Sequence, residues 1–281
     1  MSRAQARVLA LRSVFRTVGV VAPGVAARWA EAIFCTPPRH EPRAGDEVFL
    51  ASGREFRVTS GSEGLVAWEW GAGPTVILVH GWGSRAARFA GMAQALVEAG
   101  FRVVGYDAPA HGRSTGRYAS LPEFSRALQA VAGDVGPVHG LVGHSLGGAA
   151  VTLALRDGLA ARRAVLLAAP SDVVHFAQAF THHLRLPARA GRTMRRNLET
   201  RLQIRWDELH LPTIARELRA SALLVHDRED ADVPYAQAEE IASAWPGARL
   251  LSTSGLGHRA ILRDPAVVRE IVAFVGEGRE G

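Results

Sequence analysis

The chain contains no lysine and only one cysteine. All 33 basic residues are arginine, and with 27 acidic residues they give a formal net charge of +6 and a pI near 10.7. Because Cys35 has no second cysteine to pair with, the fold cannot depend on an internal disulfide bond or on an oxidising compartment. Charged residues make up 21% of the chain and hydrophobic residues 48%, a composition that excludes a disordered chain and fits one folded domain with an insertion.

The arginines are spread along the chain and are not interleaved with aromatic residues or a groove-binding helix. We therefore predict no nucleic-acid partner, despite the basic pI. One denser patch lies within residues 185–205. It could attract an anionic acyl compound or lipid headgroups, or it could be an ordinary solvated basic face. Its members are Arg185, Arg189, Arg192, Arg195, Arg196, Arg201 and Arg205.

The N-terminal segment lacks a hydrophobic run long enough to span a membrane. The apolar stretch Val18–Ala27 is interrupted at Pro23, ends at Arg28, and falls well short of the ~20 residues that a span needs. Arginines precede it, as in a signal peptide, but the interruption argues against one. We interpret the segment as a helix packed on the domain; the alternatives are a membrane-surface anchor and a cover for the active site. The expected location is the cytoplasm, with peripheral membrane contact through this helix left open. Its apolar stripe would contain Leu11, Phe15, Val18 and Ala22.

Beyond Pro37 and Pro38 the pattern changes to alternating strands and helices. Thr75–Val79 is a continuous aliphatic run, typical of a strand buried on both faces, and a helical segment follows it. The same alternation repeats towards the C-terminus and predicts an α/β fold, with a mostly parallel sheet covered by helices on both faces. An antiparallel pair of strands should precede it. The predicted strands are Arg54–Val58, Leu65–Trp70, Thr75–Val79, Phe101–Tyr106, Val138–Val142, Ala164–Leu167, Leu223–His226 and Arg249–Ser252.

The alternation stops between Pro170 and about Arg216. This segment is too long for an ordinary connection in a compact domain, so we predict a small helical cap inserted at residues 171–216. The predicted organisation is an N-terminal helical extension over residues 1–45 and a core formed by residues 46–170 and 217–281.

A candidate nucleophile lies where one predicted strand meets the next helix. Residues 143–147 read Gly-His-Ser-Leu-Gly, the pattern G-x-S-x-G, directly after a buried strand and directly before a helix. Small residues at both ends allow a tight turn that holds Ser145 in a strained backbone conformation. The sequence therefore predicts that Ser145 projects from the carboxyl edge of the sheet, where open α/β sheets place their sites.

The loop at residues 80–83, His-Gly-Trp-Gly, follows an earlier strand of the same sheet. Hydrolysis of an acyl compound by a serine needs backbone amides aimed at the negative oxygen of the tetrahedral intermediate. We assign these donors to the amides of Trp82 and Leu146. His80 either braces this loop or contacts the substrate.

A serine needs a histidine base, and the chain offers eleven histidines. His258 follows the last predicted strand in a glycine-containing loop that can return the imidazole over the sheet. The acid that orients it should follow the preceding strand. Asp230 lies 28 residues before His258, which leaves room for one helix and one strand, and we favour it over Asp232.

These motifs together resemble the α/β-hydrolase superfamily, and specifically its bacterial capped serine esterase, lipase and peptidase-like members. The resemblance covers roughly residues 50–278. It is carried by five segments in the expected order, namely HGWG at 80–83, DAPAHGRS at 107–114, GHSLGG at 143–148, Asp230 to Pro234, and the pair Gly257 and His258.

The resemblance implies a twisted, mostly parallel sheet, a lid over the site and hydrolysis without cofactor or metal. A serine at position 145 argues against the dehalogenase and epoxide-hydrolase branches, which attack with a carboxylate. The expected activity is cleavage of a carboxylic ester, or of a related acyl compound, through an acyl-enzyme. Thioesterase, lactonase, carbon-carbon bond hydrolase and acyltransferase activities use the same three side chains and stay open, while a binding module without turnover predicts a defective set. The expected partner is a small acyl substrate, and the oligomeric state is not predicted. Trp82, Phe176, Phe180, Leu184 and Leu186 could line an acyl pocket, or the last four could form the core of the cap.

Overall fold

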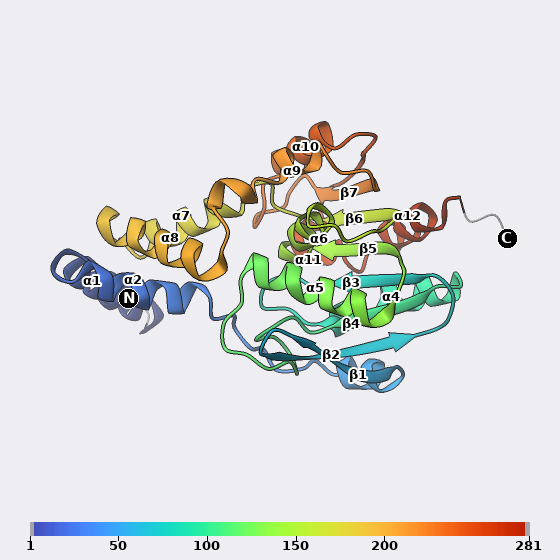
Figure 1. The fold of residues 1–281 in the computed structure, drawn as a ribbon, viewed down its shortest axis with the longest axis horizontal. Helices are drawn as coiled ribbons and strands as arrows, with labels where there is room; N and C mark the ends of the chain where they lie inside the picture. Colours follow the sequence, from blue (N-terminus) through green and yellow to red (C-terminus); the bar gives the residue numbers. More distant parts are fainter. Residues whose placement is uncertain (1–2, 279–281) are drawn as a thin grey trace. The chain divides into compact units, whose positions relative to one another are not determined.

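The computed structural model describes residues 3–278, which divide into two compact units (Figure 1). The helical unit consists of residues 3–36 and 172–210. The core unit consists of residues 37–171 and 211–278. The domain boundaries predicted at residues 45, 171 and 216 stay predictions. In the structure the chain passes from one unit to the other after Thr36, Ser171 and His210. No helix within the described part of the chain is both long and apolar enough to cross a membrane.

The helical unit joins two segments that are far apart in the sequence. Helices α1 (Arg3–Val21) and α2 (Pro23–Phe34) come from the N-terminus, and α7 (Val173–His183) and α8 (Ala188–Leu202) come from the insertion, followed by the short η2 (Trp206–Leu209). Buried alanines of α2 contact α8, whose buried side chains recur every four residues. The sequence analysis treated the two segments separately, because no sequence pattern connects one amphipathic helix to its partner. The buried residues on this contact are Ala26, Ala27, Ala30, Ala190, Met194, Leu198 and Leu202.

The N-terminal segment forms two helices where the sequence analysis expected one. The break lies at Ala22, because Pro23 has no amide hydrogen to donate and instead begins a new helix at its first position. The predicted apolar stripe is only partly correct. Phe15 is buried at 1% exposure, but Leu11 is 39% exposed.

The predicted mostly parallel sheet is confirmed. Its eight strands follow the order β1-β2-β4-β3-β5-β6-β7-β8. β1 and β2 pair with each other and with β4 in antiparallel fashion, and all other pairs are parallel. The strands are β1 (Arg54–Ser60), β2 (Glu63–Trp70), β3 (Thr75–Val79), β4 (Arg102–Tyr106), β5 (Val138–His144), β6 (Arg163–Leu167), β7 (Ser221–Asp227) and β8 (Arg249–Thr253).

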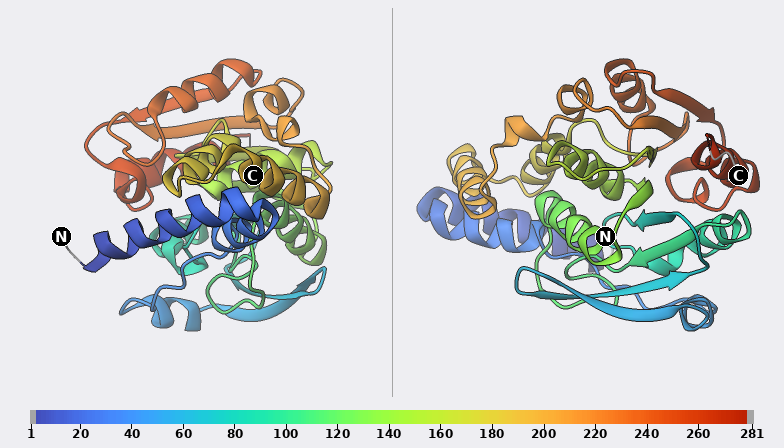
Figure 2. Two further views of the ribbon diagram at one scale, coloured as in Figure 1. Left: turned by 90° about the vertical axis from the view of Figure 1, so that its left-hand side faces the viewer. Right: turned by 45° about the vertical axis from the view of Figure 1, so that its right-hand side comes forward.

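Helices cover both faces of this sheet (Figure 2). Every residue of β3 is buried, which explains its unbroken aliphatic sequence. Val76 and Leu78 belong to the apolar core on the side of α4 and α12, and the alternation of side chains along a strand turns Ile77 and Val79 to the opposite face. The first face carries α4 (Ala90–Glu98) and α12 (Pro265–Gly276), and the second carries α5 (Leu121–Val135), α6 (Leu146–Arg156), α9 (Leu211–Ala215) and α10 (Tyr235–Ala244).

Three short helices complete the core unit. They are α3 (Asp46–Ala51), η1 (Ala86–Phe89) and α11 (Gly257–Ala260). The helical segment predicted after Thr75–Val79 therefore starts with a 3-10 turn, η1, before α4.

Two buried histidines connect the loops that follow β3 and β4. His80 donates from Nδ1 to the Gly81 carbonyl at 2.7 Å, and its Nε2 accepts from the Ala108 amide at 2.9 Å. His111 donates from Nδ1 to the Pro109 carbonyl at 2.8 Å, and its Nε2 accepts from the Gly83 amide at 2.9 Å. Both rings must be neutral, because each Nε2 receives a backbone hydrogen. Burial lowers the pKa of His80 to about 4 and that of His111 to about 3.

We expect these two histidines to make the folded protein sensitive to acid. In the unfolded chain a histidine binds its proton near pH 6.5, whereas both folded values lie lower, so their contribution to stability is complete above about pH 6.5 and is lost as the pH falls towards 4 and then 3. Urea unfolding at a series of pH values measures the effect.

The variant His111→Gln should show a shallower dependence of the unfolding free energy on pH. The matched control is His40→Gln, since His40 is exposed. Equal pH dependence in the wild type and in both variants would contradict the account.

Candidate active site

Ser145 lies in a strained turn between β5 and α6. Its φ of 53° and ψ of −122° place it outside the regions that non-glycine residues favour. The flanking glycines make the turn possible: a Cβ at Gly143 would lie 2.5 Å from the Gly147 carbonyl oxygen, and one at Gly147 would lie 2.1 Å from the Val79 oxygen. Only glycine fits at either position, so the predicted G-x-S-x-G turn has the backbone that it requires.

The loop after β3 passes directly against this turn. A Cβ added to Gly81 would lie 3.0 Å from the Cβ of Ser145, so the two backbones approach closely. The amides of Trp82 and Leu146, predicted to hold an oxyanion, donate to no protein acceptor among the residues that the structure describes. Leu146 is the first residue of α6, where an amide has no partner within the helix. Both amides are thus available to a ligand.

The structure brings His258 and Asp230 together. Nδ1 of His258 donates to Oδ2 of Asp230 at 2.8 Å, and the Asp230 side chain is fully buried while that of His258 is 12% exposed. His258 lies in the short helix α11 that follows β8, and Asp230 lies in the loop after β7. Asp232, the alternative acid, is exposed and contributes only its amide, which donates to Oδ1 of Asp230.

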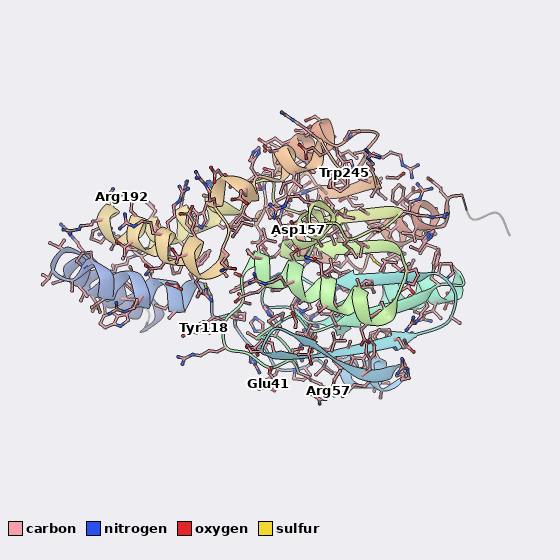
Figure 3. The ribbon with its side chains drawn as sticks, in the orientation of Figure 1. Glu41, Arg57, Tyr118, Asp157, Arg192 and Trp245 are labelled. Atoms are coloured by element: carbon pink, nitrogen blue, oxygen red, sulfur yellow. The ribbon has the colours of Figure 1, made fainter. Side chains whose placement is uncertain are left out.

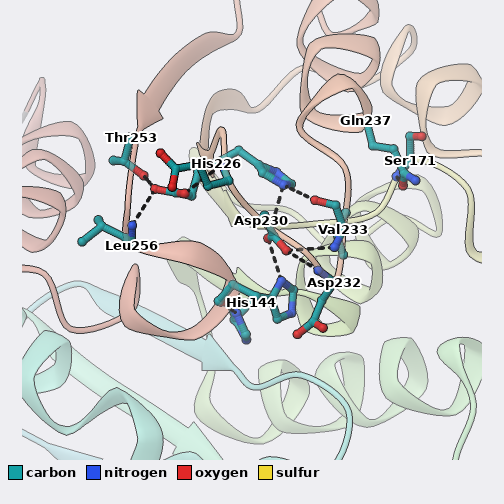
Figure 4. A network of polar contacts seen from close by, with 12 residues as sticks. His144, Ser171, His226, Asp230, Asp232, Val233, Gln237, Thr253 and Leu256 are labelled. Atoms are coloured by element: carbon teal, nitrogen blue, oxygen red, sulfur yellow. Dashed lines mark hydrogen bonds and ion pairs between the residues drawn. The ribbon is translucent and has the colours of Figure 1, made fainter.

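Asp230 is surrounded by donors (Figure 4). Oδ1 accepts from the amides of Asp232 at 2.8 Å and Val233 at 2.9 Å. Nε2 of His226 lies 3.4 Å from Oδ2 and donates to the Val233 carbonyl at 2.9 Å. Burial by itself would raise the pKa of Asp230, but hydrogen bonds from His226, His258 and the Val233 amide outweigh it and hold the pKa far below its ordinary value. The carboxylate therefore stays ionised beside His258.

Asp227 connects the loop that carries Asp230 with the segment that carries His258. Its Oδ2 accepts from the Thr253 hydroxyl at 2.7 Å and from the Leu256 amide at 3.0 Å, and its Oδ1 accepts from the Glu229 amide at 3.0 Å. Burial would raise the pKa of Asp227, but these bonds lower it. The sequence analysis assigned no role to Asp227. Its position at the end of β7, at the start of the loop that carries the favoured acid, was the available signal for this role.

His144 anchors the histidine loop from the other side. Its Nε2 donates to the His258 carbonyl at 2.8 Å, and the two rings lie 4.8 Å apart. Burial is the main cause that lowers the pKa of His144 to about 3. His144 therefore acts as a neutral donor that fixes the backbone at position 258.

The other residues predicted to contact the substrate lie partly in the core unit and partly in the helical unit. Both nitrogens of His80 bind backbone, so we assign it to loop bracing, one of its two predicted roles. Trp82 is 38% exposed and packs edge-on against His111. Phe176, Phe180 and Leu184 belong to the helical unit, where Leu184 is buried and Phe180 packs against Phe34, and their part in an acyl pocket stays a prediction. In the described part of the chain no group of three or more metal-binding side chains is arranged to hold an ion.

Three solved structures with similar folds are distant from this chain in sequence. An esterase from Exiguobacterium antarcticum superposes with a TM-score of 0.63 at 17% identity, covering 80% of this chain and 100% of its own. An enol-lactonase from Burkholderia xenovorans gives 0.62 at 17% identity, covering 79% and 100%. The ferulic acid complex of Est1E from Butyrivibrio proteoclasticus gives 0.62 at 16% identity, with the same coverage. At this identity the likeness shows the fold.

A family model described as serine aminopeptidase, S33, matches residues 72–269, which include every strand from β3 to β8 and the loops that carry Ser145, Asp230 and His258. With the sheet order, the strained turn at Ser145 and this match, the chain belongs to the S33 serine aminopeptidase family of α/β-hydrolases.

Proposed function

We propose that this hydrolase cleaves carboxylic esters through an acyl-enzyme formed on Ser145. The observation that carries the proposal is the 2.8 Å hydrogen bond from Nδ1 of His258 to the buried Asp230. It selects one tautomer of the imidazole, since the proton on Nδ1 leaves Nε2 free to accept. A base so oriented is what a serine hydroxyl requires to become a nucleophile.

In the first half of the proposed reaction, Oγ of Ser145 attacks the ester carbonyl carbon while Nε2 of His258 accepts the hydroxyl proton. The resulting imidazolium is stabilised by Asp230, whose lowered pKa keeps it from taking the proton itself. The tetrahedral intermediate collapses, the carbon–oxygen bond to the leaving group breaks, and His258 returns its proton to the departing alcohol. The acid part of the ester remains bound to Ser145.

In the second half, water replaces the alcohol. His258 removes one proton from the water, whose oxygen attacks the acyl carbon, and the bond to Ser145 breaks as the proton passes to its Oγ. The products are the free carboxylic acid and the unmodified serine. The amides of Trp82 and Leu146 serve both halves, since each passes through a negatively charged oxygen at one position, and one such donor is worth about 3 kcal/mol.

The substrate class can be tested separately from the serine chemistry. The similar structures include an esterase and an enol-lactonase, and the family description names a peptidase, so the leaving group distinguishes the candidate activities. Hydrolysis should therefore be compared on p-nitrophenyl esters from acetate to decanoate, a lactone, a thioester and an aminoacyl p-nitroanilide. The proposal predicts that the esters have the highest kcat/KM.

Removing the nucleophile should abolish turnover. The variant Ser145→Ala should lose at least about 10³-fold in kcat on the preferred ester, because the covalent step cannot occur. It should also fail to react with a fluorophosphonate probe that labels the wild type at Ser145. Ser171 provides a matched control: it is buried in the core unit and its hydroxyl donates to Glu240, so Ser171→Ala should retain turnover and labelling. Turnover that survives Ser145→Ala would refute the proposal.

The two candidate acids give a paired test. Asp230→Asn should lower kcat by about 10³- to 10⁴-fold, since an amide that donates to Nδ1 would hold His258 in the wrong tautomer. Asp232→Asn alters an exposed side chain two residues away and should leave kcat within about twofold. Steady-state kinetics on one ester measures both, and equal losses in the two variants would contradict the assignment of Asp230.

Asp227 is expected to act as a positioning residue. In Asp227→Asn the side-chain NH2 group would face the Thr253 hydroxyl and the Leu256 amide, which are themselves hydrogen-bond donors. The unfolding free energy should therefore fall by about 1–3 kcal/mol. We expect kcat to fall by about 10- to 100-fold with little change in KM, because the loop of His258 loses its anchor. Thr253→Ser keeps the hydroxyl bond and should retain kcat, whereas Thr253→Val should lower it. If the role of Asp227 were purely structural, both Thr253 variants would change stability, and kcat would not differ between Thr253→Ser and Thr253→Val.

A further inference from the structure

The positive charge of the chain is concentrated in the helical unit. Residues 1–36 and 172–210 contain 12 arginines and 5 carboxylates, whereas the rest of the chain contains 21 arginines and 22 carboxylates. The helical unit therefore has a formal charge of +7 and the core unit one of −1. A charge of this size on so small a unit attracts anionic surfaces over about a Debye length.

Helix α1 combines this charge with exposed apolar side chains. It contains no acidic residue. Leu9 is 46% exposed, Val20 71% and Val21 81%. Such exposure of large aliphatic side chains along one helix is unusual on a protein surface that stays in water.

Two exposed aliphatic residues of α1 share a face with an arginine. Leu9, Arg16 and Val20 are spaced by seven and four residues, which places them on one side of the helix, and all three are exposed. Arg16 pairs with no carboxylate among residues 3–278. Phe15 and Gly19, which are buried, lie between about 60° and about 140° around the helix from these three residues, so this exposed face lies beside the buried side of α1.

Helix α2 also combines exposed apolar side chains with an exposed arginine. Trp29 is 48% exposed and Ile33 is 44% exposed, one turn apart. Arg28 beside them is exposed and, like Arg16, has no carboxylate partner within the described residues. Tryptophan and arginine next to aliphatic side chains are typical of helices that lie in the interface of a bilayer.

A groove with basic lining residues lies next to the exposed face of α1 that carries Leu9, Arg16 and Val20. It has a volume of about 680 Å³ and is lined by residues from α1, from α7 and from the turn that follows α7. Arg12 reaches it from α1, one turn from both Leu9 and Arg16, and donates to the His183 carbonyl at 2.7 Å. The groove thus places guanidinium groups next to the exposed apolar face. Its lining residues are Arg12, Ala179, His182, His183, Arg185 and Leu186.

We propose that the helical unit docks on the surface of an anionic phospholipid bilayer. Leu9, Val20 and Val21 of α1 enter the interface, and Arg12 and Arg16 face the lipid phosphates. The charge favours this occupant over a second copy of the chain, since two units of +7 repel each other. The exposed aliphatic side chains favour it over nucleic acid, which offers them no apolar phase. The inference does not depend on the chemistry of Ser145.

The experiment is co-sedimentation of the full chain with vesicles, using phosphatidylcholine alone and phosphatidylcholine mixed with phosphatidylglycerol. The wild type and Ser145→Ala should bind equally to the anionic vesicles, bind little to the neutral ones, and dissociate as salt is raised. Arg16→Gln should weaken binding by about fivefold, the effect of one basic residue near the surface. Val20→Glu should weaken it by at least about tenfold, since it replaces an inserted side chain with a repelled one.

Two matched controls lie in the core unit. Val48→Glu alters a valine that is 75% exposed on α3, and Arg57→Gln alters an exposed arginine of β1, which is labelled in Figure 3. Both should bind vesicles as the wild type does. Val20→Glu should also hydrolyse a short soluble ester at the wild-type rate, which confirms that it is folded.

Absence of binding to anionic vesicles, or losses of equal size in the Val48 and Val20 variants, would overturn the proposal. Light scattering that shows a dimer broken by Val20→Glu, with no vesicle binding, would assign the surface to a second copy instead. Binding to duplex DNA as tight as to vesicles, and insensitive to Val20→Glu, would reduce the effect to general attraction for polyanions and would equally overturn it.

Discussion

The candidate site depends on the close approach of three backbone segments. The end of β5 lies against the start of α6, and the start of α6 lies against the end of β3. At Gly143 and Gly147 the distances leave no room for a side chain, and the closeness of these segments forces the turn that holds Ser145 at a positive φ. Strain of this kind persists only where surrounding structure over-determines it. Here the fully buried strand β3 supplies that support, because Val79 and Gly81 pack directly against the turn.

A network of buried polar groups holds the other loops at the same edge of the sheet. His80 and His111 connect the loops after β3 and β4, Asp227 connects those after β7 and β8, and His144 binds the backbone of the last. Nearly every polar atom in this network has a partner, and a satisfied network of this kind specifies one arrangement of its loops. One buried exception is Nδ1 of His226, which has no partner among the described residues, while its Nε2 donates to the Val233 carbonyl.

Local patterns made the core predictable. The aliphatic run of β3 and the glycines around Ser145 are each dictated by burial or backbone geometry that involves neighbours in sequence, and their interpretation needed no knowledge of distant contacts. The choice of Asp230 over Asp232 rested on spacing alone, and the structure places Asp230 against His258. The role of Asp227 could not be predicted in this way, because its partners Thr253 and Leu256 lie at the end of the neighbouring strand β8 and in the loop after it, and any of four neighbouring acidic residues could have made those bonds.

The helical unit escaped prediction for a related reason. Helix α2, whose buried residues include Ala26 and Ala30, contacts α8 from a distant part of the sequence, and small apolar residues carry no information about which helix they contact. The break at Ala22 was visible as Pro23, but Pro23 was interpreted only as an interruption of an apolar run. Charge, in contrast, could have been counted by segment once the two segments were known to form one unit.

The central claim is that Ser145 carries the acyl group during turnover. Mixing the protein with a p-nitrophenyl ester, quenching in acid within the first turnover and measuring the intact mass and its peptides tests it directly. The account predicts a mass increase equal to the acyl group, confined to the peptide that contains Ser145 and absent from Ser145→Ala. Steady release of p-nitrophenol with no such adduct, or with an adduct on another residue, would contradict it.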